Sequence, residues 1–418
     1  MLFVNRVYPP DNAATGQILS ELTEHLKTLG WQITVLTSQT DPLAATQEVA
    51  AGVRIERVKG LPFNRKSHWR RALSYLSLYP AILWRLLTLP STDVILTMTD
   101  PPLISVLGGI AKLFRKGHLV HWAQDLYPEI AESMGVIQKG GLAAKILGKL
   151  SDWGLRQHDQ IICIGRCMYD RLIARGIPAS AITIIPNWAD TENVWPVQRQ
   201  RNRFRKKYGL GDRPLVIYSG NLGLAHPFEA ILDAARILLA SMPEARLVFI
   251  GDGPRLDEVK ARAEQEQLHN ILFLPFQPHD RLAESLSAAD LHLACMYDEL
   301  CGLVVPSKVY GVLAAGRPCI FLGPEKSEAA RLIQENECGS VLPVTPSGSL
   351  LAEEILKWLR DQEKMQAAGE RARAAAERTN LEKAALAFDD LLRQGLKVEV
   401  TQISGKESFN NGYHGARR

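Results

Sequence analysis

Three residues, Pro306, Ser307 and Lys308, stand directly before a helical pattern that spans 309–316. Serine often caps a helix, and the free N–H groups at a helix start attract anions. A lysine held at this point adds a positive charge, so the segment predicts a pocket for a diphosphate. Lys308 could instead be a solvated surface charge, but the apolar residues around it predict burial and favour the pocket.

Two glycine-containing loops could bring the backbone close to a phosphate. Gly16 lies between the first strand and a helix that we expect to begin near Ile18. An ordinary strand-to-helix turn explains this segment equally well. The run 251–254 follows a strand and matches half of a dinucleotide fingerprint, but the third glycine is missing. An NAD-dependent oxidoreductase is therefore a minor hypothesis, while Gly251 is expected to let a ligand pass close to the backbone.

Short β-branched runs alternate with longer amphipathic segments along the chain, which predicts βαβ units and parallel sheets. In such α/β domains ligands bind at the carboxyl ends of the strands, so we expect a substrate in a cleft between two domains. The first series of strands is expected at 32–37, 53–58, 94–98, 118–122, 160–164 and 183–185, and the second at 215–219, 246–250, 271–274, 291–294, 318–321 and 340–342.

The two series predict two domains, at 1–190 and 213–380, with a linker at 191–212. The basic run 199–207 falls in this linker, and a solvated helix face is the favoured interpretation over docking on nucleic acid or lipid. A C-terminal helix is expected at 381–396. The remainder, 397–418, has little apolar content and is expected to be disordered.

Composition excludes several classes of protein. The 418 residues are 46% hydrophobic and 22% charged with a net charge of +4, which argues against intrinsic disorder and against nucleic acid as a partner. None of the six cysteines forms a Cys-x-x-Cys pair, so most are expected to be reduced and buried, in a cytoplasmic protein. Neither a signal peptide nor a membrane-spanning segment is expected.

One series of motifs in the second half of the chain resembles a known family. It consists of Asp290, the run Glu299-x-x-Gly302-Leu303-Val304, the run 314–318, and Cys338-Gly339. This order and spacing resemble the C-terminal domain of family 4 glycosyltransferases of GT-B fold. The segments 12–16, 186–190 and 251–254 resemble further family segments, so that the resemblance covers residues 1 to about 390. Within the family, 124–129 and 306–308 are similar to bacterial enzymes that build exopolysaccharide, colanic-acid-type polymers and O-antigen.

The resemblance implies two Rossmann-like domains that face each other across a cleft, the first binding an acceptor and the second a nucleotide sugar. It implies transfer of a sugar from a nucleotide diphosphate sugar to a hydroxyl acceptor, with the anomeric configuration retained. A lipid-linked saccharide is the expected acceptor. The chain contains no Asp-x-Asp motif, which agrees with a transferase that needs no metal or other cofactor and that stabilises the leaving diphosphate with helix ends and a lysine.

The resemblance also places site residues. Glu299 corresponds to the position that contacts the donor sugar, and the backbone amides of Leu303 and Val304 to those that contact phosphate. The second family glutamate is absent, because its place counts to Ser307 or to Gly311. The full set predicted to bind the donor is Gly16, Gly220, Asn221, Gly251, Phe276, Leu303, Val304, Ser307 and Lys308.

The two cations with which the family binds phosphate are also absent, because Asn221 and His226 occupy their places. Lys308 is expected to supply the lost charge. These departures keep a second hypothesis open, in which the protein is a catalytically inactive GT-B homologue that binds a nucleotide sugar or a partner transferase.

Two polar residues lie at the end of a predicted strand in the first domain. His121 ends the strand and Asp125 follows four residues later. Family members place a polar group here near the reacting sugar, so His121, Asp125 and Glu299 are the predicted catalytic residues, with the first two orienting or deprotonating the acceptor. A histidine beside Trp122 can also be a hydrogen-bonded core residue, but the convergence of two polar groups favours the functional interpretation.

A basic and aromatic segment could contact a membrane. Arg65, Lys66, Arg70 and Arg71 precede the apolar and aromatic run 75–86. Such a segment can lie in a bilayer interface, which would suit a lipid-linked acceptor and peripheral attachment at the inner, anionic face of a membrane. A core-facing helix with solvated charges at its start explains the same residues, and the two interpretations stay open.

Overall fold

The structure is a computed structural model that describes residues 1–418 except 12, 40–44, 62–67, 224–225 and 412–418. The chain divides into two units, each built around its own sheet. Unit 1 comprises Met1–Ile164, Tyr169–Ile185 and the C-terminal helix from Glu382 onwards, and unit 2 comprises Gly165–Met168 and Pro186–Leu381. The chain therefore returns to unit 1 after it has completed unit 2.

The sheet of unit 1 has eight strands in the order β3-β4-β2-β1-β5-β6-β7-β8. All neighbours are parallel except β3, which pairs antiparallel with β4 at the edge. Six of the strands, all except β3 and β8, are mostly buried, as expected for a parallel sheet. The strands are β1 Leu2–Val4, β2 Thr34–Ser38, β3 Gln47–Ala50, β4 Val53–Val58, β5 Val94–Thr97, β6 His118–Ala123, β7 Gln160–Cys163 and β8 Ile182–Ile184.

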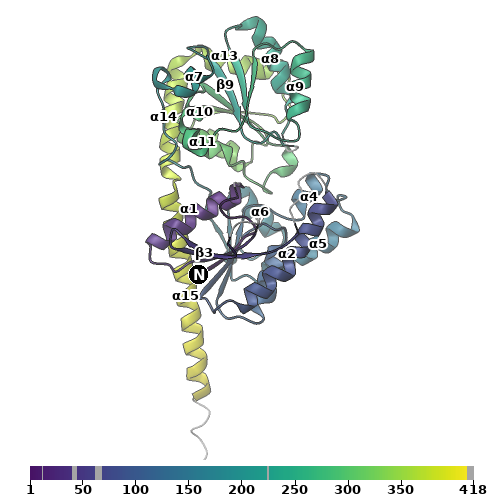
Figure 1. Ribbon diagram of the computed structural model, residues 1–418, viewed down its shortest axis with the longest axis vertical. Coiled ribbons are helices and arrows are strands. Elements are labelled where there is room, and N and C mark those ends of the chain that lie inside the picture. Colours follow the sequence, from purple (N-terminus) through teal and green to yellow (C-terminus); the bar gives the residue numbers. More distant parts are fainter. Residues whose placement is uncertain (12, 40–44, 62–67, 224–225, 412–418) are drawn as a thin grey trace, which may run out of the picture. The chain divides into compact units, whose positions relative to one another are not determined.

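Helices cover this sheet because each presents an apolar stripe to it. Leu78, Ile82 and Leu86 of α2 are buried in a core with Leu2 and Ile95 of the strands. α3 packs against both α2 and α5, and thus lies between them on one side of the unit. The helices of unit 1 are α1 Ala14–Thr28, α2 His68–Thr88, α3 Ile104–Lys112, α4 Glu129–Ser133, α5 Leu142–Arg156, α6 Arg166–Ala174, which starts in unit 2, and α15 Leu381–Asn411 (Figure 1).

Two tryptophan side chains of unit 1 contact the helix α15. The Phe388 ring meets the buried Trp122 ring edge-on with centroids 4.9 Å apart, and the Trp31 indole N–H donates to Asp389 at 2.6 Å. The helix continues to Asn411, past the end at 396 that the sequence predicts. No proline interrupts it, and low apolar content alone does not prevent a helix from continuing.

The sheet of unit 2 has six parallel strands in the order β11-β10-β9-β12-β13-β14. The strand order reverses its direction after β11, where the chain crosses to the other side of β9. Such a switch point is where open α/β sheets bind ligands. The strands are β9 Leu215–Ser219, β10 Arg246–Ile250, β11 Ile271–Leu274, β12 Leu291–Cys295, β13 Cys319–Leu322 and β14 Gly339–Leu342.

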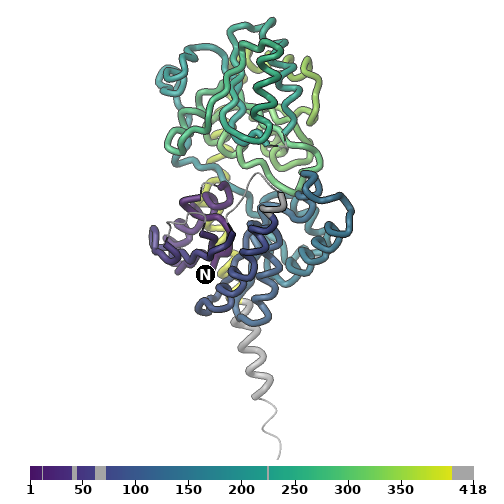
Figure 2. The backbone as a smooth tube through the Cα atoms, turned by 45° about the vertical axis from the view of Figure 1, so that its right-hand side comes forward, coloured from purple at the N-terminus to yellow at the C-terminus, as the bar shows by residue number. Residues whose placement is uncertain are grey.

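The main core of unit 2 lies between its sheet and the neighbouring helices α8 and α13. Trp358 of α13 is buried there, and its indole N–H donates to Ser340 at 2.9 Å. The helices are α7 Arg203–Lys207, α8 Glu229–Ser241, α9 Leu256–Gln265, α10 Leu282–Ser287, α11 Lys308–Ala314, α12 Glu328–Glu335, α13 Gly348–Arg360 and α14 Gln362–Arg378. Figure 2 shows this part of the chain in colours from teal through green to yellow-green.

All twelve strands that the sequence predicts are present, each with ends within two residues of the prediction. The edge strand β3 was not predicted, because Gln47 and Glu48 give it a polar, largely exposed pattern. The helix α1 begins at Ala14 rather than near Ile18.

The prediction that the basic run 199–207 is a solvated helix face is wrong for two of its members. Arg205 is buried and donates to the carbonyl oxygens of Ala288, Gly211 and Arg213. Arg199 and Arg205 both pair with Asp290, which stands just before β12. The arginines therefore fasten the connecting segment to the sheet of unit 2.

The six cysteines are free thiols, and four of them, Cys163, Cys295, Cys319 and Cys338, are buried as expected. Over the described residues, every helix is too short or too polar to cross a membrane.

Candidate functional site: two polar strand ends

In unit 2 the loops that follow β9 and β10 are joined backbone to backbone. The Gly220 N–H donates to Ile250 O at 2.8 Å, and the Leu222 N–H donates to Asp252 O at 2.9 Å. Because β9 and β10 are parallel neighbours, their carboxyl ends meet at the same edge of the sheet. The loop that contains Gly220 and the predicted glycine loop 251–254 thus form one surface.

The glycines of these loops are required by the contact between the loops. A Cβ atom on Gly251 would lie 2.0 Å from Gly220 O, and one on Gly253 would lie 2.5 Å from Leu222 O. Both residues also have φ values, +147° and +155°, that favour glycine. The partial dinucleotide fingerprint is therefore explained by close packing of backbone between the two loops.

Lys308, the first residue of α11, reaches this surface. Its Nζ donates to the Tyr218 hydroxyl at 2.6 Å and lies 3.9 Å from the centre of the Tyr218 ring. Its Cε is 3.4 Å from the position of a Cβ on Gly220. Burial lowers the pKa of Lys308 to about 8, so the amine is still mostly protonated at neutral pH. The structure thus places a partly buried cation beside the first glycine loop.

His226 does not replace a cation. Its Nδ1 donates to Cys295 O at 2.8 Å, and burial, together with the charges of Lys308 and Arg255, lowers the pKa of His226 to about 3. Arg255 is a fixed charge in the same loop region, but it is paired with Glu229 and Glu258 and donates to His226 O. Lys308 is therefore the cation without a carboxylate partner on this surface, within the described part of the chain.

The segment after β12 places Glu299 in solvent, in a short 3₁₀ turn at Asp298–Leu300. The backbone amides of Leu303 and Val304 both donate to Leu300 O, at 2.9 and 3.4 Å. Their predicted contact with phosphate would require this turn to open. Ser307 occupies the N-cap position of α11 as predicted, but its hydroxyl makes no capping hydrogen bond.

Two further predicted residues flank the glycine surface. Asn221 is exposed, and its carbonyl accepts a hydrogen bond from the Tyr218 hydroxyl at 2.9 Å. Phe276, after β11, is 56% exposed, and its ring lies 3.4 Å from the position of a Cβ on Gly251. Gly220, Asn221, Gly251, Phe276 and Lys308 are thus brought together at the carboxyl ends of β9, β10 and β11.

In unit 1, His121 and Asp125 line the same small cavity, with Thr99, Tyr127 and Arg175. The cavity measures about 20 Å³, enough for one water molecule. Burial and the nearby Asp100 raise the pKa of Asp125 to about 7. Burial lowers the pKa of His121 well below its ordinary value, so this ring is neutral. The two groups that the sequence predicts to converge do share one polar space.

Gly16 is explained by packing in unit 1. It lies in the first turn of α1 and is buried, and a Cβ there would approach Val7 C and O to 3.2 Å. The amides of Gly16 and Gln17 both donate to Ala13 O within the turn. The glycine lets the start of α1 lie against the loop that follows β1.

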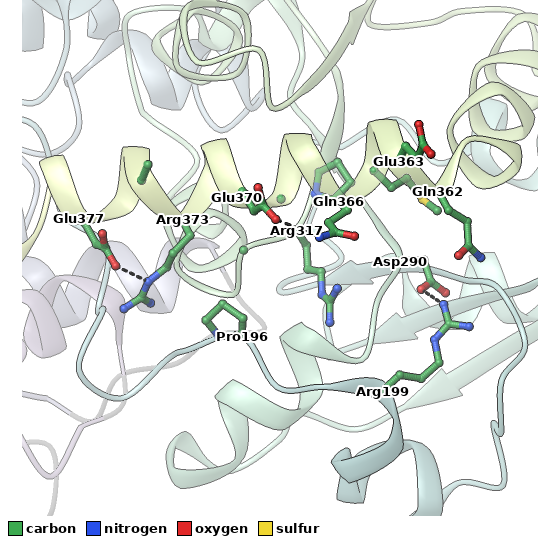
Figure 3. A pocket seen from close by; sticks show the side chains of 15 residues that line it. Pro196, Arg199, Asp290, Arg317, Gln362, Glu363, Gln366, Glu370, Arg373 and Glu377 are labelled. Atoms are coloured by element: carbon green, nitrogen blue, oxygen red, sulfur yellow. Dashed lines mark hydrogen bonds and ion pairs between the residues drawn. The ribbon is translucent and has the colours of Figure 1, made fainter.

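A pocket of about 720 Å³ is lined by residues of the connecting segment, of α14 and of the segments before β12 and β13, and by none of the residues predicted to bind the donor (Figure 3). Asp290 and Pro318, which line it, precede β12 and β13, so the pocket is at the amino ends of the strands. Arg199 pairs with Asp290, and Arg317 donates to the backbone at Ser287 and Val197. Arg373 of α14 donates to Val194 O, so the cations of this pocket fasten the connecting segment to its neighbours in unit 2.

Sequence reasoning missed several polar residues of these sites: Thr97, His158, Arg175 and Tyr218. Thr97 and Tyr218 lie at or one residue before the carboxyl end of a predicted strand. The rule that such ends meet at one edge of a sheet was the signal that could have found them.

Comparison with known proteins identifies the class. Residues 200–375 match the family model described as glycosyl transferases group 1, and residues 14–188 match the glycosyl transferase 4-like domain. The chain belongs to this glycosyltransferase family and has the GT-B fold, which confirms the predicted fold class and the predicted enzyme class.

Among curated relatives, the chain is 29% identical over 250 residues to the probable glycosyltransferase WbjE of Pseudomonas aeruginosa. That alignment covers 59% of this chain and 61% of the relative, or less than two thirds of its length. The chain is 26% identical to the putative colanic acid biosynthesis glycosyl transferase WcaI of Escherichia coli, over 78% of this chain and 84% of the relative. Both relatives are thus named as glycosyltransferases, and one of them is assigned to colanic acid biosynthesis.

Among solved structures, Anabaena HepE in complex with UDP-glucose superposes with a TM-score of 0.70 at 16% identity. The match covers 94% of this chain and 99% of HepE. At this identity the likeness establishes the shared fold.

Proposed function

We propose that this protein transfers a sugar from a nucleotide diphosphate sugar to a hydroxyl group of a lipid-linked saccharide, with retention of the anomeric configuration. The observation that carries the proposal is Lys308, a cation without a carboxylate partner among the described residues, held against Tyr218 beside the loop of Gly220. The UDP-glucose complex of HepE, which has the same fold, supports a nucleotide sugar as the donor.

The donor would occupy the carboxyl edge of the sheet of unit 2. Lys308 would neutralise the charge that develops on the departing diphosphate, a role that needs no metal ion. The exposed ring of Phe276 offers a flat apolar face on which a base can stack. Glu299, exposed after β12, would select the donor sugar through its hydroxyl groups.

The acceptor chemistry would belong to unit 1. Asp125 has a pKa near 7 and can exchange a proton with a hydroxyl at neutral pH, which is the property that a general base needs. His121 is neutral and can accept a hydrogen bond from a sugar hydroxyl.

A lipid-linked acceptor requires access to a membrane surface, and α5 presents one apolar stripe to solvent. Leu142, Ile146, Leu150 and Trp153 recur at intervals of four, four and three residues, which places them on one helical face. Their exposure runs from 76% at Leu142 to 36% at Trp153. This stripe faces away from the core of unit 1.

The charges beside this stripe favour an anionic bilayer as the partner. Lys139, Lys145 and Lys149 are exposed around it. The one acidic residue of α5, Asp152, is already paired with Arg175. A second soluble protein would equally cover the apolar stripe, but an unbalanced rim of lysines fits lipid headgroups best.

The sequence left open whether the segment now seen as α2 faces the core or a membrane, and its apolar side chains divide between the core and the exposed surface. Leu78, Ile82 and Leu86 face the core, while Leu76 and Trp84 are exposed, Trp84 by 71%. Arg65 and Lys66 lie outside the described residues. We assign α2 to the same peripheral contact with the inner face of an anionic membrane.

The proposal is tested by incubating the purified full chain with a panel of nucleotide sugars. A thermal shift with one of them identifies the donor, because a ligand that binds the folded state raises its stability. Transfer is then measured on lipid-linked saccharides, with NMR of the product anomer. A donor-specific shift with transfer and retention supports the proposal, and inversion of the anomer contradicts it.

A second candidate is a catalytically inactive protein that binds a nucleotide sugar or a partner transferase. The neutral His226 and the occupied amides of Leu303 and Val304 favour it. A thermal shift without turnover on any acceptor would select this candidate.

A further inference from the structure

Four polar groups in unit 1 form a continuous hydrogen-bonded chain that ends at His121. Thr97 and His121 are direct neighbours on the parallel strands β5 and β6. The Thr97 Oγ1 lies 2.9 Å from His121 Nδ1 and 3.0 Å from His158 Nε2. On its other side, His158 Nδ1 lies 2.8 Å from Gly154 O, in the last turn of α5. Thr97, His121 and His158 are all buried.

The chemistry of each group fixes the direction of every hydrogen bond, beginning at Gly154. A carbonyl oxygen can only accept, so His158 Nδ1 carries a hydrogen and donates to it. A neutral imidazole has one N–H, which leaves Nε2 of His158 as an acceptor. The Thr97 hydroxyl therefore donates its single hydrogen to His158 Nε2.

The direction of the last hydrogen bond, between Thr97 and His121, follows in the same way. Because the Thr97 hydrogen is already used, Thr97 Oγ1 can only accept from His121, and His121 Nδ1 must carry the hydrogen. The second ring nitrogen of His121, Nε2, is then left with a lone pair. Nε2 has no hydrogen-bond partner among the residues that the structure describes.

The surroundings of His158 keep its imidazole ring neutral. Its two ring nitrogens contact a hydroxyl and a carbonyl rather than a carboxylate, so a buried positive charge there would lack a counter-ion. Burial lowers the pKa of His158 to about 4, in agreement with this geometry.

We infer that Thr97 and His158 are positioning residues that hold His121 in the Nδ1–H tautomer, with its Nε2 lone pair free to accept a hydrogen bond from a substrate hydroxyl. The role of His121 toward a substrate rests on the proposed function. The tautomer itself follows from the hydrogen-bond chain.

Gly108 in α3 leaves space for the hydrogen bond between Thr97 and His158 because it has no side chain. A Cβ atom on Gly108 would lie 2.9 Å from His158 Nε2 and 3.0 Å from Thr97 Cγ2. Any larger residue at Gly108 would press on the hydrogen bond between Thr97 and His158. The glycine therefore belongs with the positioning groups.

The tautomer can be measured by ¹⁵N NMR of the imidazole rings in the full chain, without substrate. The chain has ten histidines, and a His121→Gln variant identifies the signals of His121 by their loss. We expect a protonated Nδ1 and an unprotonated Nε2 for His121 at pH 7.5. A protonated Nε2 in the wild-type protein would overturn the inference.

Two variants test the positioning role. Thr97→Val removes the hydroxyl from a similar shape, and His158→Phe frees the Thr97 hydrogen to turn toward His121. Both should give a mixture of His121 tautomers, whereas Thr97→Ser, which keeps the hydroxyl, should retain the wild-type spectrum. Melting temperatures identify any variant that fails to fold, and the second variant then carries the test.

The kinetic consequence separates positioning from simple stability. Once a donor is known, Thr97→Val and His158→Phe should lower kcat roughly 10- to 100-fold, toward the low end of the range for proton-transfer groups, with little change in KM. Thr97→Ser should recover most of that loss. An unchanged kcat in variants with a mixed tautomer would overturn the positioning role. Because the spectrum is recorded without substrate, failure of the proposed transfer reaction would be seen separately.

Discussion

At the scale of single residues, burial decides which polar side chains carry charge. Lys308 and His226 lie in the same region of unit 2, yet their pKa values of about 8 and about 3 leave one charged and the other neutral at pH 7. The lysine Nζ is also held by the hydroxyl and the ring face of Tyr218, an aromatic contact that favours a cation. The cation lost at His226 is thus replaced from another element, α11.

Asp125 should make the stability of the protein depend on pH. Its pKa rises from 3.8 to about 7 on folding, so ionisation of the carboxyl costs the folded state stability as the pH rises from 4 to 7. Asp125→Asn removes this cost. Relative to wild type, the variant should gain stability across that interval and reach a plateau of roughly 4 kcal/mol above pH 7.

This gain is measured by urea unfolding of both proteins between pH 4 and pH 8. Asp100→Asn provides a control, since it removes the neighbouring charge and should lower the pKa of Asp125. A stability difference between Asp125→Asn and wild type that does not vary with pH would show that Asp125 is ionised throughout.

Sequence reasoning reached some of these residues and not others, for a physical reason. Lys308 was predicted from its own neighbours, because Pro306 and Ser307 mark a helix start and apolar flanks indicate burial. Thr97 contacts His121 over 24 positions through the pairing of β5 with β6, and it contacts His158, which lies between α5 and β7, over 61 positions. The sequence of one strand does not determine its register with a parallel neighbour, so these contacts cannot be predicted from either segment alone.

At the scale of elements, unbroken apolar runs make the buried strands predictable from the sequence, and an edge strand without such a run is not predicted. Buried parallel strands have long apolar runs, so every predicted strand is present. The edge strand β3 has a polar pattern, and the amides of Leu303 and Val304 turn inward in a way that motif spacing cannot indicate.

The stripe on α5 makes a prediction at this scale. The full chain should sediment with vesicles of phosphatidylcholine and phosphatidylglycerol, and less at high salt, because the lysine contribution is screened. Lys145→Gln with Lys149→Gln should weaken the partition constant by roughly 30-fold, at about 1 kcal/mol per lysine. Ile146→Gln should weaken it at both salt concentrations.

The matched control for Ile146→Gln is Leu350→Gln on α13 of unit 2, because Leu350 is 41% exposed and Ile146 is 51% exposed. This variant should bind vesicles as the wild type does. Equal sedimentation of all variants, or equal binding to neutral and anionic vesicles, would remove α5 from the membrane contact.

At the scale of the whole molecule, each unit supplies a different part of the proposed reaction. Unit 2 holds the cation and the glycine surface, and unit 1 holds His121 and Asp125 beside one cavity. After unit 2 the chain returns to unit 1 with α15, where Phe388 contacts Trp122.

Because the charge on the leaving group is assigned to Lys308, the complete reaction should proceed without a divalent metal ion. Turnover of the nucleotide sugar is expected to be equal in EDTA and in magnesium, measured by release of the nucleoside diphosphate. A loss of turnover in EDTA that magnesium reverses would mean that a metal ion, rather than the lysine, carries this task.

The most direct test of the account is the turnover of Lys308→Ala, with Lys364→Ala as control. Lys364 also lies over an aromatic ring, that of Trp358, with its Nζ 4.2 Å from the ring centre, but far from the glycine loops in sequence. With melting temperatures unaltered, Lys308→Ala should lower turnover by roughly two to three powers of ten, the usual cost of removing a group aimed at developing charge. The control should keep wild-type turnover. Wild-type turnover in Lys308→Ala would show that the diphosphate is held elsewhere and would contradict the assignment of the donor site.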